Sequence, residues 1–258
     1  MLEKKENQRL SLNCEGILRC ARYAFMPNKL SFCGPDKNRD LLYYCQTGKI
    51  DGGLNLILEK FQTLYPYLEL IARANQIRDP FDERVIEAYW IGNQLLENIG
   101  KSALYHHLID EQQLKKKLNP KLFKQTVSKI PLGAKPHHSF HVFNVWKRTG
   151  NLDVAHTLST MDLCRISWGK IRKIKKPYLE VEYQPLILEK DELKLGNLIP
   201  QKILFEMNQD GFIKEPRIGQ WVSFHWEFAC EFLNKKQINY LKKYTQESID
   251  LANNLVRP

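Results

Sequence analysis

The spacing of apolar residues changes once along this 258-residue chain, and that change limits what the chain can fold into. Up to about residue 155, apolar residues recur every three or four positions, which is typical of helices. From residue 164 onward the segments 164–174, 178–189 and 202–213 alternate or carry β-branched residues, which is typical of strands. We therefore predict an α+β fold, in which a mainly helical N-terminal domain (1–155) precedes a small OB-like β-barrel with a C-terminal helix (160–258). The boundary is predicted between Gly150 and Thr160.

Turn and cap residues in the first half predict where individual helices begin and end. DPFDERVIEAYWIGNQLLENI predicts a helix that begins at Asp79-Pro80 and ends at Gly100, because an acidic first turn and a closing glycine suit the two ends. Asn119-Pro120 predicts the start of another helix, which covers NPKLFKQTVSKI.

The second half has its own local signals. Asp210-Gly211 predicts a hairpin. EPRIGQWVSFHWEFACEFL predicts a short strand, Trp221–Phe224, that leads into a helix starting at Phe228-Ala229-Cys230. Asn234 is a plausible N-cap for the terminal helix.

Composition excludes several classes of protein. The net charge is +10, but the lysines and arginines are scattered among acidic residues, which favours a solvated surface over a nucleic-acid interface. Six cysteines in a chain of this length do not indicate a disulfide scaffold. No apolar run approaches the ~20 residues that span a bilayer, and MLEKKENQRL lacks the apolar core of a signal peptide. We expect a cytoplasmic protein without a membrane partner.

Cys164 and His225 are the two candidate metal ligands of the barrel. Cys164 is predicted to open its first strand, and His225 directly follows the strand Trp221–Phe224. A thiolate and an imidazole at two strand ends suit iron or zinc, yet two ligands are too few for a closed structural site. Together they predict a carrier site that other ligands complete. Taken singly, a histidine or a cysteine at such a position is more often a structural residue of the core.

The sequence around both residues resembles the HypC/HupF family of small nickel–iron hydrogenase maturation chaperones. Cys-Arg-Ile-Ser-Trp-Gly-Lys-Ile (164–171) resembles the opening cysteine, apolar step, glycine and strand of that family. Gly-Gln-Trp-Val-Ser-Phe-His-Trp-Glu-Phe-Ala (219–229) resembles its Gly-x-Trp/Tyr-Val-x-x-His-x-x-Phe-Ala segment. The resemblance covers about residues 160–250. It departs at Cys164, which is internal, at Trp168 in place of a proline, and in a longer interval, as if one hairpin were extended around Glu189 to Leu198.

The resemblance implies a non-enzymatic role in hydrogenase maturation. Cys164 and His225 would transiently hold an iron fragment that carries cyanide and carbon monoxide. The partners would be a HypD-type scaffold protein and the hydrogenase large-subunit precursor, and aromatic residues between Trp221 and Phe228 would form part of the docking surface. The N-terminal half resembles only uncharacterised bacterial and archaeal proteins, which imply no function.

The helical half has a second group of candidate ligands in Pro-His-His-Ser-Phe-His-Val-Phe (136–143). His138 and His141 would share one face of a helix, and Cys33, in a predicted turn, could join them in a second metal site. Cys14, Cys20 and Cys45 are further possible ligands. Cys33 could also be a nucleophile assisted by either histidine. The alternative is a half-buried segment that lines the contact between the two halves.

The sequence is also compatible with two other functions. Small barrels often bind single-stranded nucleic acid through a basic, aromatic face, and residues of that kind are Trp168, Arg172, Lys173, Lys175 and Lys176. An enzyme centred on the histidines and cysteines of the helical half would instead need a deep pocket. The absence of a phosphate-binding glycine loop, a Gly-x-Ser-x-Gly elbow and a His-Glu-x-x-His motif argues against the common ATPase, α/β-hydrolase and zinc-protease classes.

Overall fold

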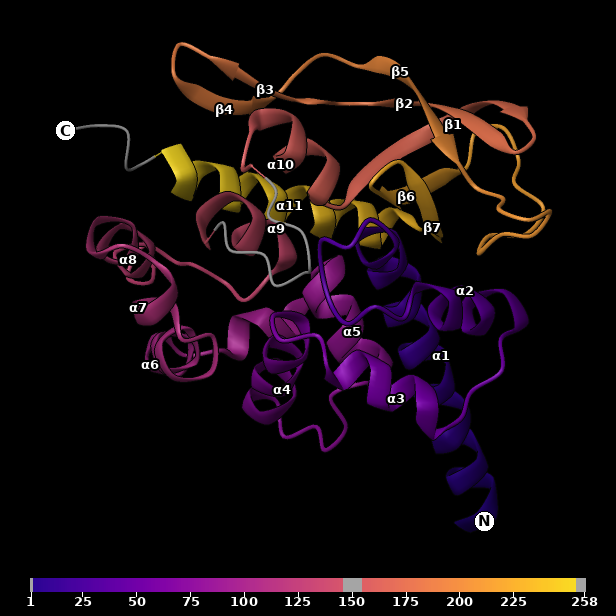
Figure 1. The fold of residues 1–258 in the computed structure, drawn as a ribbon, viewed down its shortest axis with the longest axis horizontal. Coiled ribbons are helices and arrows are strands. Elements are labelled where there is room, and N and C mark those ends of the chain that lie inside the picture. The colour runs from indigo at the N-terminus through magenta and orange to yellow at the C-terminus, as the bar shows by residue number, and fades with distance from the viewer. Residues whose placement is uncertain (1, 146–154, 254–258) are drawn as a thin grey trace.

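The computed structural model describes residues 2–145 and 155–253, with side chains from residue 15 onward, and the fold is α+β as predicted (Figure 1). The described part of the first half contains helices and no strands. Its helices are α1 (Leu2–Lys29), α2 (Asn38–Thr47), α3 (Gly52–Glu59), α4 (Leu64–Ala74), α5 (Glu83–Trp90), α6 (Lys101–His106), α7 (Leu114–Lys117), α8 (Pro120–Val127) and α9 (His138–Phe140). A 3₁₀ turn (Gln94–Asn98) and two π-helical turns (His107–Glu111 and His141–Val145) complete it.

Side-chain caps fix several of these helix starts. Asn119 caps α8 by accepting a hydrogen bond from the Leu122 amide at 2.9 Å, so this predicted start is confirmed. The helix expected from Asp79-Pro80 begins later, at Glu83, because Asp82 is its N-cap. The predicted end at Gly100 is also wrong. Helix α5 ends at Trp90, and Gly100 stands before α6 as its N-cap residue.

The second half contains a closed five-stranded barrel with the strand order β1-β2-β5-β7-β6. Its strands are β1 (Ser167–Lys175), β2 (Tyr178–Tyr183), β5 (Ile199–Leu204), β6 (Trp221–His225) and β7 (Phe228–Leu233). Antiparallel pairing of β1 with β6 closes the barrel, and β5 pairs with β7 in parallel. Strands β3 (Leu186–Glu189) and β4 (Glu192–Leu195) form a separate two-stranded sheet. This hairpin lies where the sequence predicted an extended one.

Residues that were expected to start a helix at Phe228 are in strand β7, so that prediction is wrong. Strands β6 and β7 are joined by Trp226 and Glu227, whose φ angles are 50° and 58°. Two consecutive left-handed residues make the tight turn that suits the twist of a hairpin. The turn carries neither asparagine nor glycine, so no local turn signal marks it.

Two further boundaries differ from expectation. Cys164 does not open a strand; it is the last residue of helix α10 (Leu158–Cys164), three positions before β1. The hairpin predicted at Asp210-Gly211 is a tight turn centred on Asn208 and Gln209, which both have positive φ, and no strand follows it directly.

The two halves are packed closely against each other. In Figure 1 the strands lie along one side of the molecule, and helix α11 (Lys235–Asn253) runs between them and most of the N-terminal helices. Asn234 caps α11 as predicted, by accepting from the Gln237 amide at 3.0 Å. The largest buried apolar cluster contains residues of both halves, from Ile17 on α1 to Leu241 on α11. Of the predicted domain boundary, residues 150–154 lie outside the described residues.

Candidate metal centre

His225 is the last residue of β6, and the helical half holds its ring in place. Only 1% of the residue is exposed. Its Nδ1 atom lies 2.7 Å from the backbone carbonyl oxygen of Tyr23 on α1. Because a carbonyl can only accept, Nδ1 carries the hydrogen, so a ring without a second proton has its lone pair on Nε2. Metal-binding histidines in proteins usually use their second nitrogen in this way, as a donor to a carbonyl or carboxylate.

Cys164 lies beside His225 because the end of α10 is hydrogen-bonded to the β6–β7 turn. The carbonyl of Leu163 accepts a hydrogen bond from the Trp226 amide at 2.9 Å. The start of the same helix is fixed by a capping box between Thr157 and Thr160. Cys164 is 6% exposed, so its thiol lies in the interior.

His138 opens α9 and faces the same interior space. Its Nε2 atom donates to the backbone carbonyl of Cys164 at 2.8 Å, which leaves the lone pair of the neutral ring on Nδ1, 3.3 Å from the Tyr89 hydroxyl. Burial, together with the nearby ring of His225, holds the pKa of His138 well below its usual value of 6.5. The imidazole is therefore neutral at physiological pH, as a metal ligand must be.

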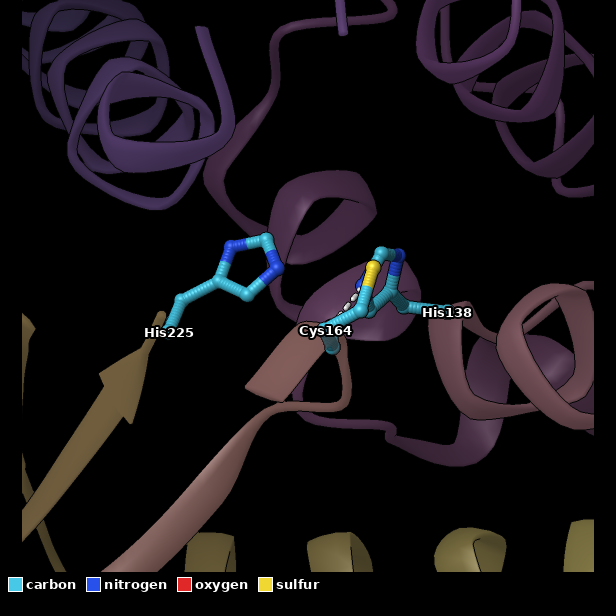
Figure 2. A group of neighbouring side chains, drawn as sticks. All are labelled: His138, Cys164 and His225. Atoms are coloured by element: carbon cyan, nitrogen blue, oxygen red, sulfur yellow. Dashed lines mark hydrogen bonds between the residues drawn. The ribbon is translucent and has the colours of Figure 1, made fainter. Parts of the chain in front are cut away.

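His138, Cys164 and His225 form one close group (Figure 2). One potential ligand atom of each residue lies within 4.8 Å of those of the other two, and all three residues are buried. In Figure 2 a ring nitrogen of His225 points toward the sulfur of Cys164. Ligand atoms of a tetrahedral site are about 3.5 Å apart, so movements on the order of 1 Å would bring these three to bonding distance. Two imidazoles and a thiolate suit zinc or iron and leave room for further ligands.

The group lines a small cavity with mostly apolar walls. The cavity has a volume of about 40 Å³, and its apolar walls include Ala24, Pro27, Phe61, Leu64, Trp90 and Val142. A buried water needs roughly 10–15 Å³ of such space, so the cavity has room for about three water-sized groups.

The two metal sites predicted from the sequence meet in this one cavity. Cys33 and His141 line it together with the three close residues, but among the described residues the close group contains neither of them. His156 also lines the cavity, and no sequence signal pointed to it. Cys20 and Cys45 are buried elsewhere in the core, where burial raises the pKa of both thiols, that of Cys20 to about 12. The side chain of Cys14 lies outside the described residues.

Two expectations about surfaces are wrong. The segment from His137 to Val145 is fully buried, not half-buried. The aromatic residues expected to form a docking surface are mostly interior. Phe224, Trp226 and Phe228 are buried, and the ring of Trp226 packs on Phe32 with centroids 4.7 Å apart. Because these three rings are buried, they cannot form a contact surface for a partner.

The basic face of the barrel lacks its predicted aromatic residue. Trp168 is 5% exposed, so it is not available to stack on a base. Two of the basic side chains are paired with carboxylates on the barrel surface, Arg172 with Glu182 and Lys176 with Glu206. These ion pairs reduce the charge that the face could offer to phosphates.

Fold and site together define a class: an α+β protein whose helical half encloses a His/Cys group at the end of an OB-like barrel. Residues 13–258 match a family model described as a family of unknown function (DUF6390), and the chain belongs to this family. No curated protein and no solved structure matches the chain. Within the described residues, no helix is both long enough and apolar enough to cross a bilayer.

Proposed function

We propose that this protein is a non-enzymatic accessory factor of nickel–iron hydrogenase maturation, which holds an iron fragment at His138, Cys164 and His225. The observation that carries the proposal is the placement of Cys164 and His225. The HypC/HupF resemblance selects these two residues, which are 61 positions apart in the sequence, and their potential ligand atoms lie within 4.8 Å of each other.

The cavity suits the proposed cargo. Iron that carries cyanide and carbon monoxide is compact, and its diatomic ligands need a small space with few competing polar groups. The apolar walls supply such surroundings, and the cavity of about 40 Å³ would have to widen somewhat to enclose the whole fragment. Two neutral imidazoles and one thiolate would supply the protein's share of the coordination, and the thiol would release its proton on binding.

The helical half makes the proposed site more complete and more enclosed than an isolated small barrel could make it. His138 adds a third ligand, and α1, α5 and α9 cover the site, so a partner's side chain is not needed to complete it. We propose that a HypD-type scaffold supplies the fragment, that this protein shields it, and that the hydrogenase large-subunit precursor receives it in the cytoplasm.

Anaerobic co-expression with a HypD-type scaffold tests the proposal. The wild type, Cys164→Ser, His225→Gln and the control Cys45→Ser would be purified and compared for bound scaffold, iron content and infrared bands of cyanide and carbon monoxide. The wild type and the control should carry iron and the bands, and the two site variants should lose both. A folded wild type that binds neither iron nor the scaffold would refute the proposal.

An enzyme remains the second candidate, because Cys33, His138 and His141 line the same cavity. A nucleophilic Cys33 would react with a haloacetamide faster than an ordinary thiol, and the rate would fall in a His138→Gln or His141→Gln variant. Equal alkylation rates in all three proteins would leave the metal role as the one function that the cavity supports.

A further inference from the structure

The side chains around the cavity differ in their access to solvent. Six of them can bind a metal: Cys33, His138, His141, His156, Cys164 and His225. His138, His141, Cys164 and His225 are buried, whereas Cys33 and His156 are both partly exposed. Cys33 and His156, the solvent-side residues, are therefore the two of the six that are partly exposed, although the Nε2 atom of His156 is itself buried.

Both solvent-side residues lie in connections whose backbone is held in place. Cys33 follows α1, and its carbonyl accepts from the Asn28 side chain at 2.8 Å. The preceding Phe32 ring contacts Trp226, next to His225. His156 stands directly before Thr157, the N-cap of α10, and Cys164 ends that helix. Cys33 is thus linked to His225 through the contact between Phe32 and Trp226. His156 is linked to Cys164 through helix α10.

Moving a metal ion from solvent to the close group has a desolvation cost, which donor atoms along the way would reduce. A divalent cation arrives hydrated, and taking it without its ligands into an apolar interior costs several kcal/mol or more. Donors placed between solvent and the final site allow the water ligands to be replaced one at a time. Every step exchanges one coordination bond for another, and the Cys33 thiol releases a proton to solvent as it binds, so no oxidant or reductant is required.

We infer that Cys33 and His156 form a transfer pair, which captures a thiolate- and imidazole-binding metal at the solvent side and passes it to His138, Cys164 and His225. The inference rests on the proposed function, since it assumes that the close group holds a metal. A transfer pair lowers the barrier in both directions. It therefore speeds loading and release by the same factor and leaves the equilibrium affinity unchanged.

Cobalt(II) alone is a suitable probe, because thiolate-to-cobalt absorption reports binding directly. The full-length wild type, Cys33→Ser, His156→Gln and their double variant would be mixed anaerobically with cobalt, and release would be followed after addition of excess chelator. The control is His106→Gln, an exposed histidine on α6. Circular dichroism verifies that each variant is folded.

The double variant should load and release cobalt about tenfold more slowly or slower, with an unchanged dissociation constant. Wild-type rates in the double variant would overturn the inference, and so would weaker binding at an unchanged loading rate, which would make the two residues ligands of the final site. These outcomes leave the proposed function intact. That function fails separately if the wild type binds no cobalt, or if Cys164→Ser and His225→Gln bind it as the wild type does, and the transfer role then fails with it.

Discussion

The Nδ1 atom of His225 donates a hydrogen bond to the backbone carbonyl of Tyr23, at 2.7 Å and across 202 positions of the sequence. His225 belongs to the barrel and Tyr23 to the first helix. Because the partner is a main-chain atom, the ring is held by the position of the whole helix α1. The helical half thus sets which nitrogen of this histidine can bind a metal.

This relationship predicts the tautomer of His225. Nitrogen-15 spectra should show that Nδ1 of His225 carries a hydrogen, and addition of zinc should shift the Nε2 resonance while Nδ1 stays protonated. The exposed His106 should show no zinc-dependent change at equimolar metal. A ring protonated on Nε2, or zinc binding through Nδ1, would contradict this arrangement.

His138 should contribute to metal affinity as much as Cys164 does. Loss of an outer-shell partner costs about 10–100-fold in metal affinity, so loss of a direct ligand should cost at least about 100-fold. Zinc affinities of His138→Gln and Cys164→Ser, measured against a chromogenic chelator, should both fall by that amount.

The Tyr89→Phe variant distinguishes a ligand role of His138 from a structural role. Tyr89→Phe removes the hydroxyl that lies 3.3 Å from Nδ1 of His138 and leaves the ring packing in place. If Nδ1 binds the metal, this variant should retain or increase zinc affinity. A loss of affinity in Tyr89→Phe as large as that in His138→Gln would indicate a structural role for the histidine.

Local sequence signals were sufficient where a short-range interaction decides the structure. Asn119 and Asn234 were recognisable as caps because each bonds a backbone amide three residues away. The change from helical to strand spacing likewise predicted the α+β fold. Strand β7 carries the apolar run Phe228-Ala229-Cys230, which α1 and the barrel interior cover on both faces. A strand buried on both faces shows no alternation, so its sequence resembles that of a buried helix.

The site could be predicted only in part, because it depends on contacts between distant segments. The family resemblance selected Cys164 and His225, and the helical spacing of His138 and His141 selected a second group. Nothing in the sequence indicated that one cavity contains both, since that follows from the packing of α9 and α10 against the end of β6. His156 lies outside any motif, and only the fold brings it to the cavity.

A second link between the halves predicts a large effect on stability. Arg19 on α1 donates to Glu231 on β7 through Nη2 at 2.7 Å and Nε at 2.9 Å, and the side chains are 7% and 15% exposed. In Glu231→Gln the arginine keeps longer contacts with Glu87 at 3.5 Å and Glu83 at 3.8 Å, so its charge stays partly compensated. The free energy of unfolding should therefore fall by about 2 kcal/mol, less than the roughly 3–5 kcal/mol that a fully unpaired buried charge costs. Urea denaturation measures this change.

The exposed pair Lys194–Glu189 provides the control for that measurement. Lys194→Gln should change the free energy of unfolding by less than about 1 kcal/mol, because solvent screens the pair. An Arg19→Met, Glu231→Leu double variant should be less destabilised than the sum of the single changes, since neither member of the buried pair is then left without the other. Equal effects of Glu231→Gln and Lys194→Gln would show that the α1–β7 link contributes little.

Two buried histidines predict that the protein loses stability in mild acid. Burial lowers the pKa of His137 from 6.5 to about 3, and it holds the pKa of His138 well below 6.5. Below pH 6.5 the unfolded chain therefore binds protons that the folded chain does not, so the free energy of unfolding falls by about 1.4 kcal/mol per pH unit for each such histidine. The loss begins near pH 6.5 and, for His137, ends near pH 3.

The contribution of one histidine can be isolated by difference. His137→Asn keeps a side-chain acceptor for the Ser139 amide and removes the titrating ring. Between pH 6 and 5 its free energy of unfolding should fall less steeply than that of the wild type, by about 1.4 kcal/mol per pH unit. Carboxylates contribute equally to both proteins and cancel. Parallel curves for wild type and His137→Asn would mean that His137 takes up its proton in the folded protein.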